Sequence, residues 1–330
     1  MLDRGEPVGF DENSAGHRRQ RRLDAVPFGP GVHALRTLAD ARALRADLAA
    51  RSGPVAVIGA GFIGAEVAAT CRQAGREVVL IEAAPVPLTR SVGAEVGMVC
   101  AELHREHGVD VRLGTAVVRH DAAAGRLELD DGSSVDAAVV VVGVGVSPCT
   151  DWLVGSGLTL DDGVVCDATG LAAPGVVAAG DVARWPNRLF DGELVGRALG
   201  QRHRHGVVRG QTVAGRRRLD PEQVFEPVPW FWSRPVHDRK LQMAGRAPGR
   251  RSPPWSAAFE ERRFVVLYGQ AGAPHRCVRH EPARARSCRA CGLVARRCGT
   301  GRGRARWPRA GPERRELVDH LDADETSSAR

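Results

Sequence analysis

Residues 54–83, PVAVIGAGFIGAEVAATCRQAGREVVLIEA, constrain the fold more than any other stretch of this chain. The apolar run at 55–58 predicts a strand buried on both faces. A glycine-rich turn follows, and residues 62–74 then have helical spacing up to Gly75. Residues 77–81 predict a second strand. A strand, a turn, a helix and a second strand form the repeating unit of a parallel sheet, so the sequence predicts an α/β fold.

Gly59, Gly61 and Gly64 form a Gly-x-Gly-x-x-Gly motif between the first strand and the helix. The first glycine permits the tight turn, the second lets a pyrophosphate approach the backbone, and the third lets the helix pack closely on the strand. Phe62 and Ile63 begin the helix, whose first amides and dipole favour bound phosphates. The motif in this context predicts a dinucleotide site.

Glu82 follows the second strand at the position where an acid accepts hydrogen bonds from both hydroxyls of the adenosine ribose. A 2′-phosphate at that place would be repelled by the carboxylate. The sequence therefore favours NAD(H) over NADP(H), with the nearby Arg90 as the residue that argues in the other direction.

The rest of this unit continues to about residue 150. We predict a helix over 94–107, a strand over 109–113 and a hairpin around the Asp-Asp-Gly turn at 130–132. The valine run 139–142 predicts a buried strand, and it leads into Gly143 and Gly145. These two glycines allow a second close backbone approach, which we expect beside the nicotinamide.

The composition of the chain restricts which classes of protein it can belong to. The net charge of +8 is carried almost entirely by arginine, and Lys240 is the only lysine. No apolar run is long enough for a membrane span, and the opening residues lack a secretory signal, so we expect a cytoplasmic protein without a membrane partner. The cysteines are expected to be core residues, not disulfides.

Five stretches of the chain, the first of them the glycine-rich turn itself, form a wider pattern: GAGFIGAE, VVGVGVSP, GVVAAGDVARWP, PVPWFWS and DRKLQMAGR. Together they resemble the FAD-dependent ferredoxin reductases similar to putidaredoxin and rhodocoxin reductases, in the pyridine nucleotide-disulphide oxidoreductase superfamily. The resemblance runs with gaps from about residue 31 to residue 270.

This resemblance implies a glutathione-reductase-like architecture of doubly wound Rossmann domains with a small α+β interface domain. The expected parts are a remnant of the first half of the FAD domain at 1–51, a complete NAD domain at 52–150, the second half of the FAD domain at 151–222, an interface domain at 223–272 and an arginine-rich, disordered tail at 273–330.

The resemblance also implies that hydride passes from NADH to FAD, and single electrons then pass to a [2Fe–2S] ferredoxin of an oxygenase system. Asp181 would accept a hydrogen bond from the ribityl chain, and Gly180 would leave room for it. Glu66 would lie near the nicotinamide carboxamide. Trp232 would either wall the flavin or pack in the interface domain, as would Trp230. No general acid, general base or metal ligand is expected.

The sequence departs from this family in its first fifty residues, which lack the expected FAD glycine motif. We therefore expect an N-terminally truncated, incomplete FAD domain. An NAD(H)-binding module without electron transfer is the alternative. A third possibility is a nucleic-acid-binding protein that uses its basic tail, but we expect no nucleic-acid partner.

Residues 197–218 and 273–330 lose the resemblance and are rich in arginine. We hypothesise that both are out-of-frame translation, as residues 1–24 would be, because GC-rich DNA read in another frame yields such a composition. Cys288 and Cys291, with Cys277 and Cys298 outside them, suggest a zinc site as the alternative for the tail, although the spacing fits no common class.

Overall fold

A computed structural model describes residues 8–9, 18–20, 25–168, 170–174, 176–178, 180–187, 194–195, 230–233, 236–245, 264–270 and 273–282. Within these ranges, the description leaves out the side chains of residues 8–9, 18–20, 90, 194–195, 230–232, 244, 264–265, 267–270 and 273–282.

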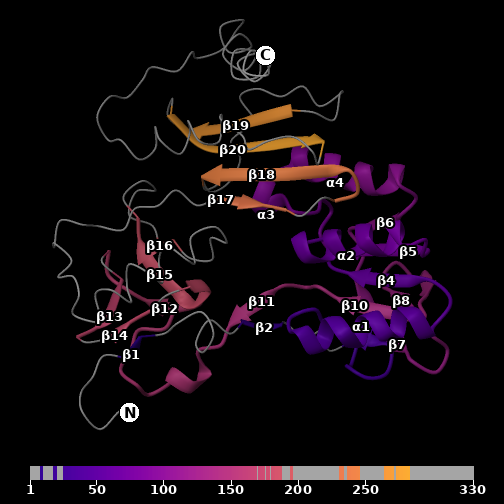
Figure 1. The fold of residues 1–330 in the computed structure, drawn as a ribbon, viewed down its shortest axis with the longest axis horizontal. Coiled ribbons are helices and arrows are strands. Elements are labelled where there is room, and N and C mark those ends of the chain that lie inside the picture. Colours follow the sequence, from indigo (N-terminus) through magenta and orange to yellow (C-terminus); the bar gives the residue numbers. More distant parts are fainter. Residues whose placement is uncertain are drawn as a thin grey trace, which may run out of the picture.

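Five parallel strands form the central sheet in the order β3-β10-β4-β5-β6 (Figure 1). Their bounds are Val32–His33 (β3), Val139–Val142 (β10), Val55–Ile58 (β4), Val78–Glu82 (β5) and Asp110–Leu113 (β6). The chain leaves β4 for β5 on one side and later returns to the other side of β4 as β10. This reversal of direction opens a crevice at the carboxyl ends of β4 and β10. The predicted parallel α/β sheet is confirmed.

Helices cover one face of this sheet. They are α1 (Leu38–Ala50), α2 (Phe62–Gln73) and α4 (Ala94–Glu106), with the short α3 (Thr89–Val92) before α4. Leu44, Cys71 and Ala101, one from each long helix, are buried in one core with Val55 and Val57 of β4. No helix in the described ranges is long and apolar enough to cross a bilayer.

An antiparallel meander covers the opposite face and replaces a helix in the crossover from β6 to β10. It consists of β7 (Val117–Asp121), β8 (Arg126–Leu129) and β9 (Ser134–Asp136). Leu127 and Leu129 of β8 are buried against Ala56 and Ile58 of β4, whereas Arg126 and Glu128, which alternate with them, face outward. Two-residue alternation of this kind is typical of an antiparallel strand with one solvated face.

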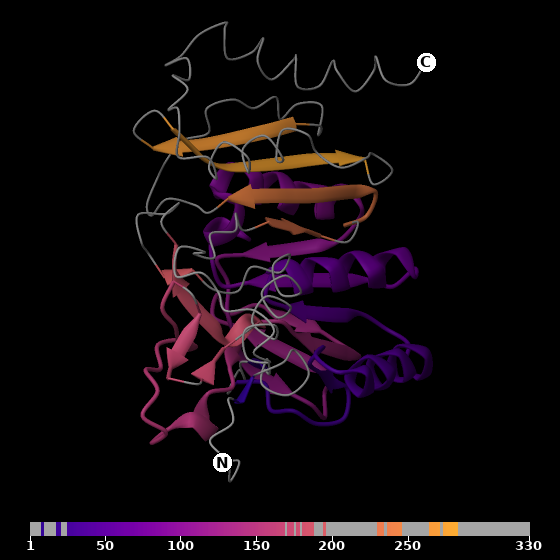
Figure 2. The same cartoon turned by 60° about the vertical axis from the view of Figure 1, so that its left-hand side comes forward.

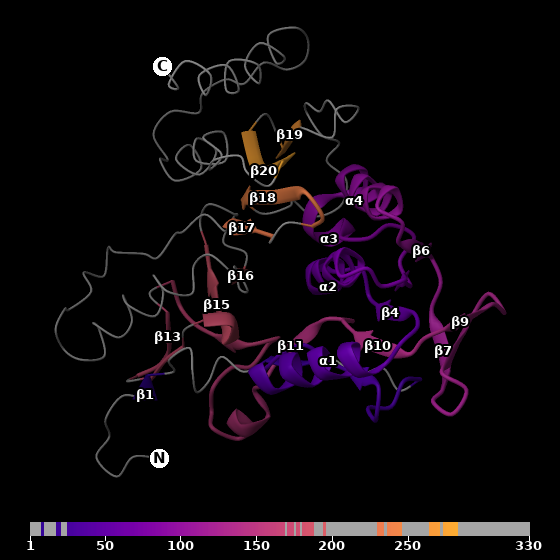
Figure 3. The same cartoon turned by 45° about the vertical axis from the view of Figure 1, so that its right-hand side comes forward.

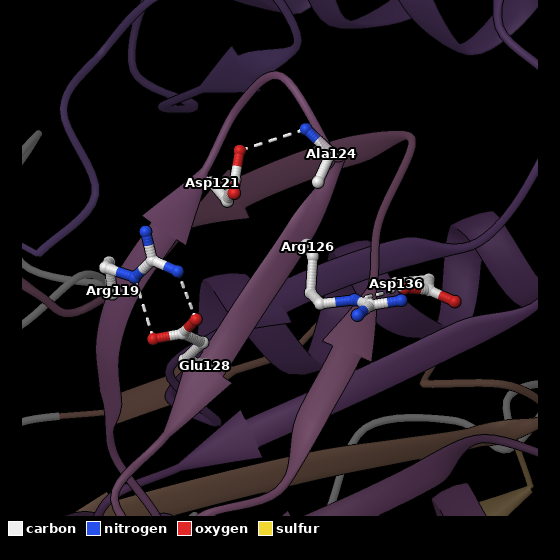
Figure 4. Close-up of polar contacts among 6 residues, drawn as sticks. All are labelled: Arg119, Asp121, Ala124, Arg126, Glu128 and Asp136. Carbon is white, nitrogen blue, oxygen red and sulfur yellow. Dashed lines mark hydrogen bonds and ion pairs between the residues drawn. The ribbon is translucent and has the colours of Figure 1, made fainter.

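The outward face of the meander carries cross-strand ion pairs (Figure 4). Arg119 donates to both carboxylate oxygens of Glu128, and Arg126 Nε donates to Asp136 Oδ1 at 3.1 Å. Opposite charges that face each other across neighbouring strands favour this register.

Residues 25–50 pack with the central sheet, although the sequence analysis grouped residues 1–51 with the flavin domain. β3 extends the sheet beyond β10, Val26 and Val32 are buried beside β10, and Leu44 of α1 lies in the helical layer. Because β3 pairs with β10 and Leu44 packs against β4, this segment belongs to the same core. The predicted boundary at residue 52 therefore divides the core that the structure forms.

A second, smaller unit follows residue 150. It contains η1 (Asp151–Leu153), β12 (Val164–Val165), β13 (Leu171–Ala173), β14 (Val176–Val177), η2 (Gly180–Val182), β15 (Ala183–Pro186) and β16 (Leu194–Val195). Its core is centred on Trp185, which is 2% exposed. β1 (Val8–Gly9) pairs with β14, and β2 (Arg18–Gln20) pairs with β11 (Val146–Pro148), so early residues join late ones here (Figure 2).

The C-terminal part of the described chain is a four-stranded antiparallel sheet in the order β17-β18-β20-β19. Its strands are β17 (Trp230–Trp232), β18 (Arg239–Gly245), β19 (Phe264–Gln270) and β20 (Ala273–Pro282). Leu241 and Val266 pack against Val92, Val96 and Val99 of α3 and α4, which places this sheet against the helical layer (Figure 3).

β20 covers the first ten residues of the segment that the sequence analysis assigned to a disordered tail. It hydrogen-bonds to β18 along one edge and to β19 along the other. Strand pairing uses backbone groups, so an arginine-rich composition does not prevent it. The rest of that tail, including Cys288 and Cys291, and the segment 197–218 lie outside the described residues.

Three histidines join α4 to the turn between β17 and β18. His104 and His237 are 2% and 6% exposed, and His237 Nε2 lies 3.1 Å from His104 Nδ1. The ring of His107, the residue after α4, stacks on His237 with centroids 4.1 Å apart. Gln73 Nε2 of α2 also donates to the carbonyl of His237 at 3.0 Å. This histidine contact connects the helical layer to the C-terminal sheet.

Candidate functional site

A cavity of about 490 Å³ lies at the carboxyl ends of β4, β5 and β10, where the order of the strands reverses. Its lining residues come from five segments: 58–62, 81–84, 86–91, 115–117 and 143–145. The volume falls within the range of cofactor and ligand pockets, and the position is the one that open parallel sheets use for binding.

Gly59 and Gly64 are required by close packing. Gly59 has φ +97°, and a Cβ there would lie 2.6 Å from the carbonyl oxygen of Gly143 at the end of β10. A Cβ on Gly64 would lie only 1.9 Å from the carbonyl oxygen of Gly59. Both distances are shorter than real Cβ contacts allow, so any side chain would push the turn away from β10 or α2 away from β4.

Gly61 differs from these two because a Cβ there would meet nothing within 4 Å. It has φ −71°, precedes α2 and lines the cavity with Phe62. The absent side chain therefore leaves open space on the cavity side, where the N-terminal end of α2 points its first amides. Ile63 is on the outer side of the helix start and is 40% exposed. Space and backbone donors at one place fit the pyrophosphate of a dinucleotide.

Glu82 is the last residue of β5 and lines the cavity. Its Oε2 accepts a hydrogen bond from the amide of Ala60 at 2.7 Å, and its Oε1 accepts one from the amide of Ala84 at 2.9 Å. A carboxylate has about four acceptor positions, so two remain for ribose hydroxyls. The carboxylate thus contacts the glycine-rich turn directly, which the sequence analysis did not foresee.

Gly143 and Gly145 also line the cavity, and Gly143 donates to the carbonyl of Ile58 at 2.7 Å. This bond joins the ends of β10 and β4. Glu66 is half-buried on α2, one turn beyond the residues that line the cavity. Arg90 belongs to α3 in the segment that borders the cavity, and its side chain is outside the description.

Three other candidate residues lie away from this cavity. Gly180 and Asp181 belong to η2 in the second unit, where Asp181 is 5% exposed and Gly180 has φ +76° with space around its Cβ position. Trp232 belongs to β17 of the C-terminal sheet, and its side chain is not described. The structure therefore groups the candidates for the dinucleotide and separates them from those assigned to the flavin.

The sequence analysis missed one wall of the cavity, residues 115–117 between β6 and β7. Asp130 holds this wall, because its Oδ1 accepts from the amide of Ala116 at 2.9 Å and its own amide donates to the carbonyl of Ala116 at 2.9 Å. Thr115 is buried, and its amide donates to the carbonyl of Glu82. The Asp-Asp-Gly hairpin signal was present in the sequence, but nothing local links it to residue 116.

The cysteines of the described part are not placed for chemistry at this cavity. Cys71, Cys100 and Cys166 are buried, and burial raises the pKa of the Cys100 thiol to about 12. A thiol with such a pKa stays protonated at neutral pH and is a poor nucleophile. None of the described cysteines lines the dinucleotide cavity. Across the same residues, no group of three or more His, Cys, Asp or Glu side chains is arranged to hold a metal ion.

Comparisons with known proteins agree with this geometry. The family model described as pyridine nucleotide-disulphide oxidoreductase matches residues 16–201. A ferredoxin–NAD(P)(+) reductase of Sphingomonas sp. is 35% identical over 264 residues, which cover 76% of this chain and 61% of that protein. The rhodocoxin reductase of Rhodococcus erythropolis is 37% identical over 258 residues, 73% of this chain and 56% of that protein.

A solved structure is also similar, the ferredoxin reductase for the CYP199A2 system from Rhodopseudomonas palustris. The TM-score is 0.71 at 31% identity, and the match covers 81% of this chain and 66% of the other. The chain thus spans less than two thirds of these relatives. The family model nevertheless matches more than half of the chain and includes the whole dinucleotide cavity. The chain belongs to the pyridine nucleotide-disulphide oxidoreductase family.

Proposed function

We propose that this chain binds NAD(H) in the cavity at the ends of β4, β5 and β10, as part of an FAD-dependent reductase that passes electrons to a [2Fe–2S] ferredoxin. The observation that carries the proposal is the combination of Gly61, the first amides of α2 and Glu82 around one space of about 490 Å³. Similarity to proteins named ferredoxin reductases supports the electron acceptor.

The cavity fits an NAD(H) molecule at two places. The start of α2 supplies backbone donors where Gly61 leaves room for a pyrophosphate. Glu82 supplies the remaining carboxylate lone pairs for the ribose hydroxyls, and its charge disfavours a 2′-phosphate. The proposed cofactor is therefore NAD(H), with Gly143, Gly145 and Glu66 toward the nicotinamide.

For FAD, the described residues supply only part of a site. Asp181 is buried in η2 beside Gly180, whose φ is positive and whose Cβ position has open space around it. These properties fit a carboxylate that accepts from a ribityl hydroxyl. When bound, a flavin converts a two-electron donor into two one-electron steps. The protein's own residues then need only to bind and orient the two cofactors.

The test is the visible absorption spectrum of the purified chain, before and after FAD and then NADH are added. We expect a flavin spectrum that bleaches when NADH is added. Bleaching with NADPH should be much weaker. Reduction of an added [2Fe–2S] ferredoxin tests the acceptor.

An NAD(H)-binding module without electron transfer is the second candidate. It is favoured by the separation between the complete dinucleotide cavity and the partial set of flavin residues. NADH binding by calorimetry without flavin uptake would support this candidate and reject the reductase. A cytoplasmic location remains a prediction, which fractionation of the producing cells with an antibody against the chain would test.

A further inference from the structure

The carboxylate of Glu82, which the proposed function assigns to the ribose hydroxyls, also accepts hydrogen bonds from the protein backbone. Both of its carboxylate oxygens accept backbone amides, one from Ala60 in the glycine-rich turn and one from Ala84 after β5. Ala60 lies twenty-two positions away in the sequence, so this bond joins two loops that leave adjacent strands. We infer that Glu82 is a positioning residue, which holds the glycine-rich turn in its binding conformation before any nucleotide arrives.

The turn has few other restraints on this side. The amide of Gly59 donates to the carbonyl of Ile81 at 2.7 Å, which continues the pairing of β4 with β5. Beyond it, the amide of Ala60 turns to the side chain of Glu82, and Gly61 begins the helix. The Ala60 bond is thus the last one that fixes the turn before the chain enters α2. Glycines on either side of Ala60 make such a restraint important, because they restrict the backbone least.

The bond also determines which amides are available to a ligand. The amides of Gly59 and Ala60 are used by Ile81 and Glu82, so neither is left for a phosphate. We expect a phosphate to bind at the start of α2, beside the open space at Gly61 and at the positive end of the helix dipole. Glu82 therefore directs a pyrophosphate toward the helix and away from the turn. A hydrogen bond to a charged carboxylate is stronger than one between neutral groups, so the single side chain of Glu82 is enough to hold the amide of Ala60.

The inference deepens the proposed function and rests on it for the nucleotide, but the state of the turn can be measured without a ligand. In the nucleotide-free chain, hydrogen exchange of the Ala60 amide reports whether its bond to Glu82 is present. In Glu82→Ala we expect exchange about tenfold faster or more at Ala60, since a hydrogen bond to a charged group is lost. Glu82→Gln keeps one acceptor oxygen and should lie between. Unchanged exchange at Ala60 in both variants would overturn the inference.

Glu77→Gln is the matched control, because Glu77 precedes the same strand with an exposed side chain and bonds to β4 only through its carbonyl. It should leave exchange at Ala60 as in the wild type. Exchange at Leu80, in the middle of β5, shows in each variant whether the sheet itself is intact. A general loss of protection at Leu80 that matches the loss at Ala60 would count against a local role.

Two probes then separate positioning from direct contact with ribose: adenosine 5′-diphosphate and its 2′,3′-dideoxy analogue, which lacks both hydroxyls. If Glu82 only bound hydroxyls, Glu82→Ala would leave the Kd of the dideoxy probe unchanged, and this result would contradict the inference. We expect that Kd to rise by about tenfold, the equivalent of about 1.4 kcal/mol, and the Kd of the complete probe to rise further. Failure of the wild type to bind either probe would reject the proposed nucleotide site, while hydrogen exchange would still decide the role of Glu82.

Discussion

The dinucleotide cavity and the histidine contact are both places where separate segments meet, but they are built from different groups. At the cavity, β4, β5 and β10 are joined by backbone hydrogen bonds, and glycines allow the close approach. At the histidine contact, side chains of α4 meet a turn 133 positions later in the sequence. The cavity therefore depends on the absence of side chains, whereas the contact depends on their protonation state. Substitutions and pH should separate the two.

The largest effect on the cavity is expected for Gly64→Ala. The added Cβ would lie 1.9 Å from the carbonyl oxygen of Gly59, and backbone atoms on both sides cannot move without separating α2 from β4. Overpacking of this kind costs about 3 kcal/mol of the free energy of unfolding. Chemical denaturation followed by circular dichroism measures the loss. A variant as stable as the wild type would show that the turn and α2 are not as closely packed as described.

Acidification should act on the histidine contact. Burial, more than the charge of neighbouring groups, lowers the pKa of His104 to about 3 and that of His237 to about 4, from an ordinary value of 6.5. Between about pH 6.5 and pH 4 the unfolded chain binds more protons than the folded one, so stability falls as the pH falls through this window.

The free energy of unfolding measured at several pH values tests this expectation. His107 and Arg72 also lower the pKa of His237, while Asp238 raises it, so these three residues face the contact. His237→Asn is a suitable variant because asparagine tolerates the φ of +58° at this position. Its stability should depend less on pH than that of the wild type. An equal pH dependence in both proteins would assign the acid sensitivity to another part of the chain.

Gly61→Ala tests the cavity without disturbing the packing. Its φ of −71° suits alanine and its Cβ would meet no atom within 4 Å, so the free energy of unfolding should stay within about 0.5 kcal/mol of the wild type. The methyl group would occupy space proposed for the pyrophosphate, and the Kd for NADH should rise by about tenfold, or 1.4 kcal/mol. Calorimetry measures the free energy of unfolding and the Kd for NADH, with Gly64→Ala as the variant for comparison. Unchanged NADH affinity would move the pyrophosphate away from Gly61.

The smallest effect is expected on the outer face of the meander. Arg119 and Glu128 form an exposed pair that is held by two hydrogen bonds, and solvent and salt screen such pairs. Arg119→Ala should unfold at nearly the same denaturant concentration as the wild type, and the small difference should shrink in 1 M salt. Leu127→Ala, on the buried face of the neighbouring strand, is the contrasting variant and should lose about 2–5 kcal/mol.

The same contrast explains what could be predicted from the sequence. The dinucleotide cavity needs particular residue types at fixed spacings, and a sequence shows these directly. The sequence therefore located the strands at 55–58 and 139–142 and the helix that begins at Phe62. It also located three residues that line the cavity: Gly59, Gly61 and Glu82. The contacts between distant segments could not be predicted in this way. Asp130 with Ala116, Glu82 with Ala60 and His104 with His237 depend on how the layers stack, which no local pattern encodes.

The boundaries of the structural units were also hard to predict, because they too depend on contacts between distant segments. The sequence placed residues 25–50 outside the nucleotide unit because their pattern alone does not say which sheet they join; pairing of β3 with β10 decides it. Residues 273–282 have a composition typical of a tail, yet two neighbouring strands with open edges accept them. Where the backbone alone determines an interaction, composition is a poor guide.

The position of β10 has a consequence for synthesis of the protein. It lies between β3 and β4, both of which precede it by more than eighty residues in the chain. While the polypeptide grows on the ribosome, these two early strands have to wait with facing edges unpaired until residues 139–142 emerge and insert between them. The same insertion brings Gly143 against Gly59 and completes the cavity. A nascent chain thus acquires its sheet and its nucleotide cavity in one late event, and an early stop codon before residue 139 would remove both together.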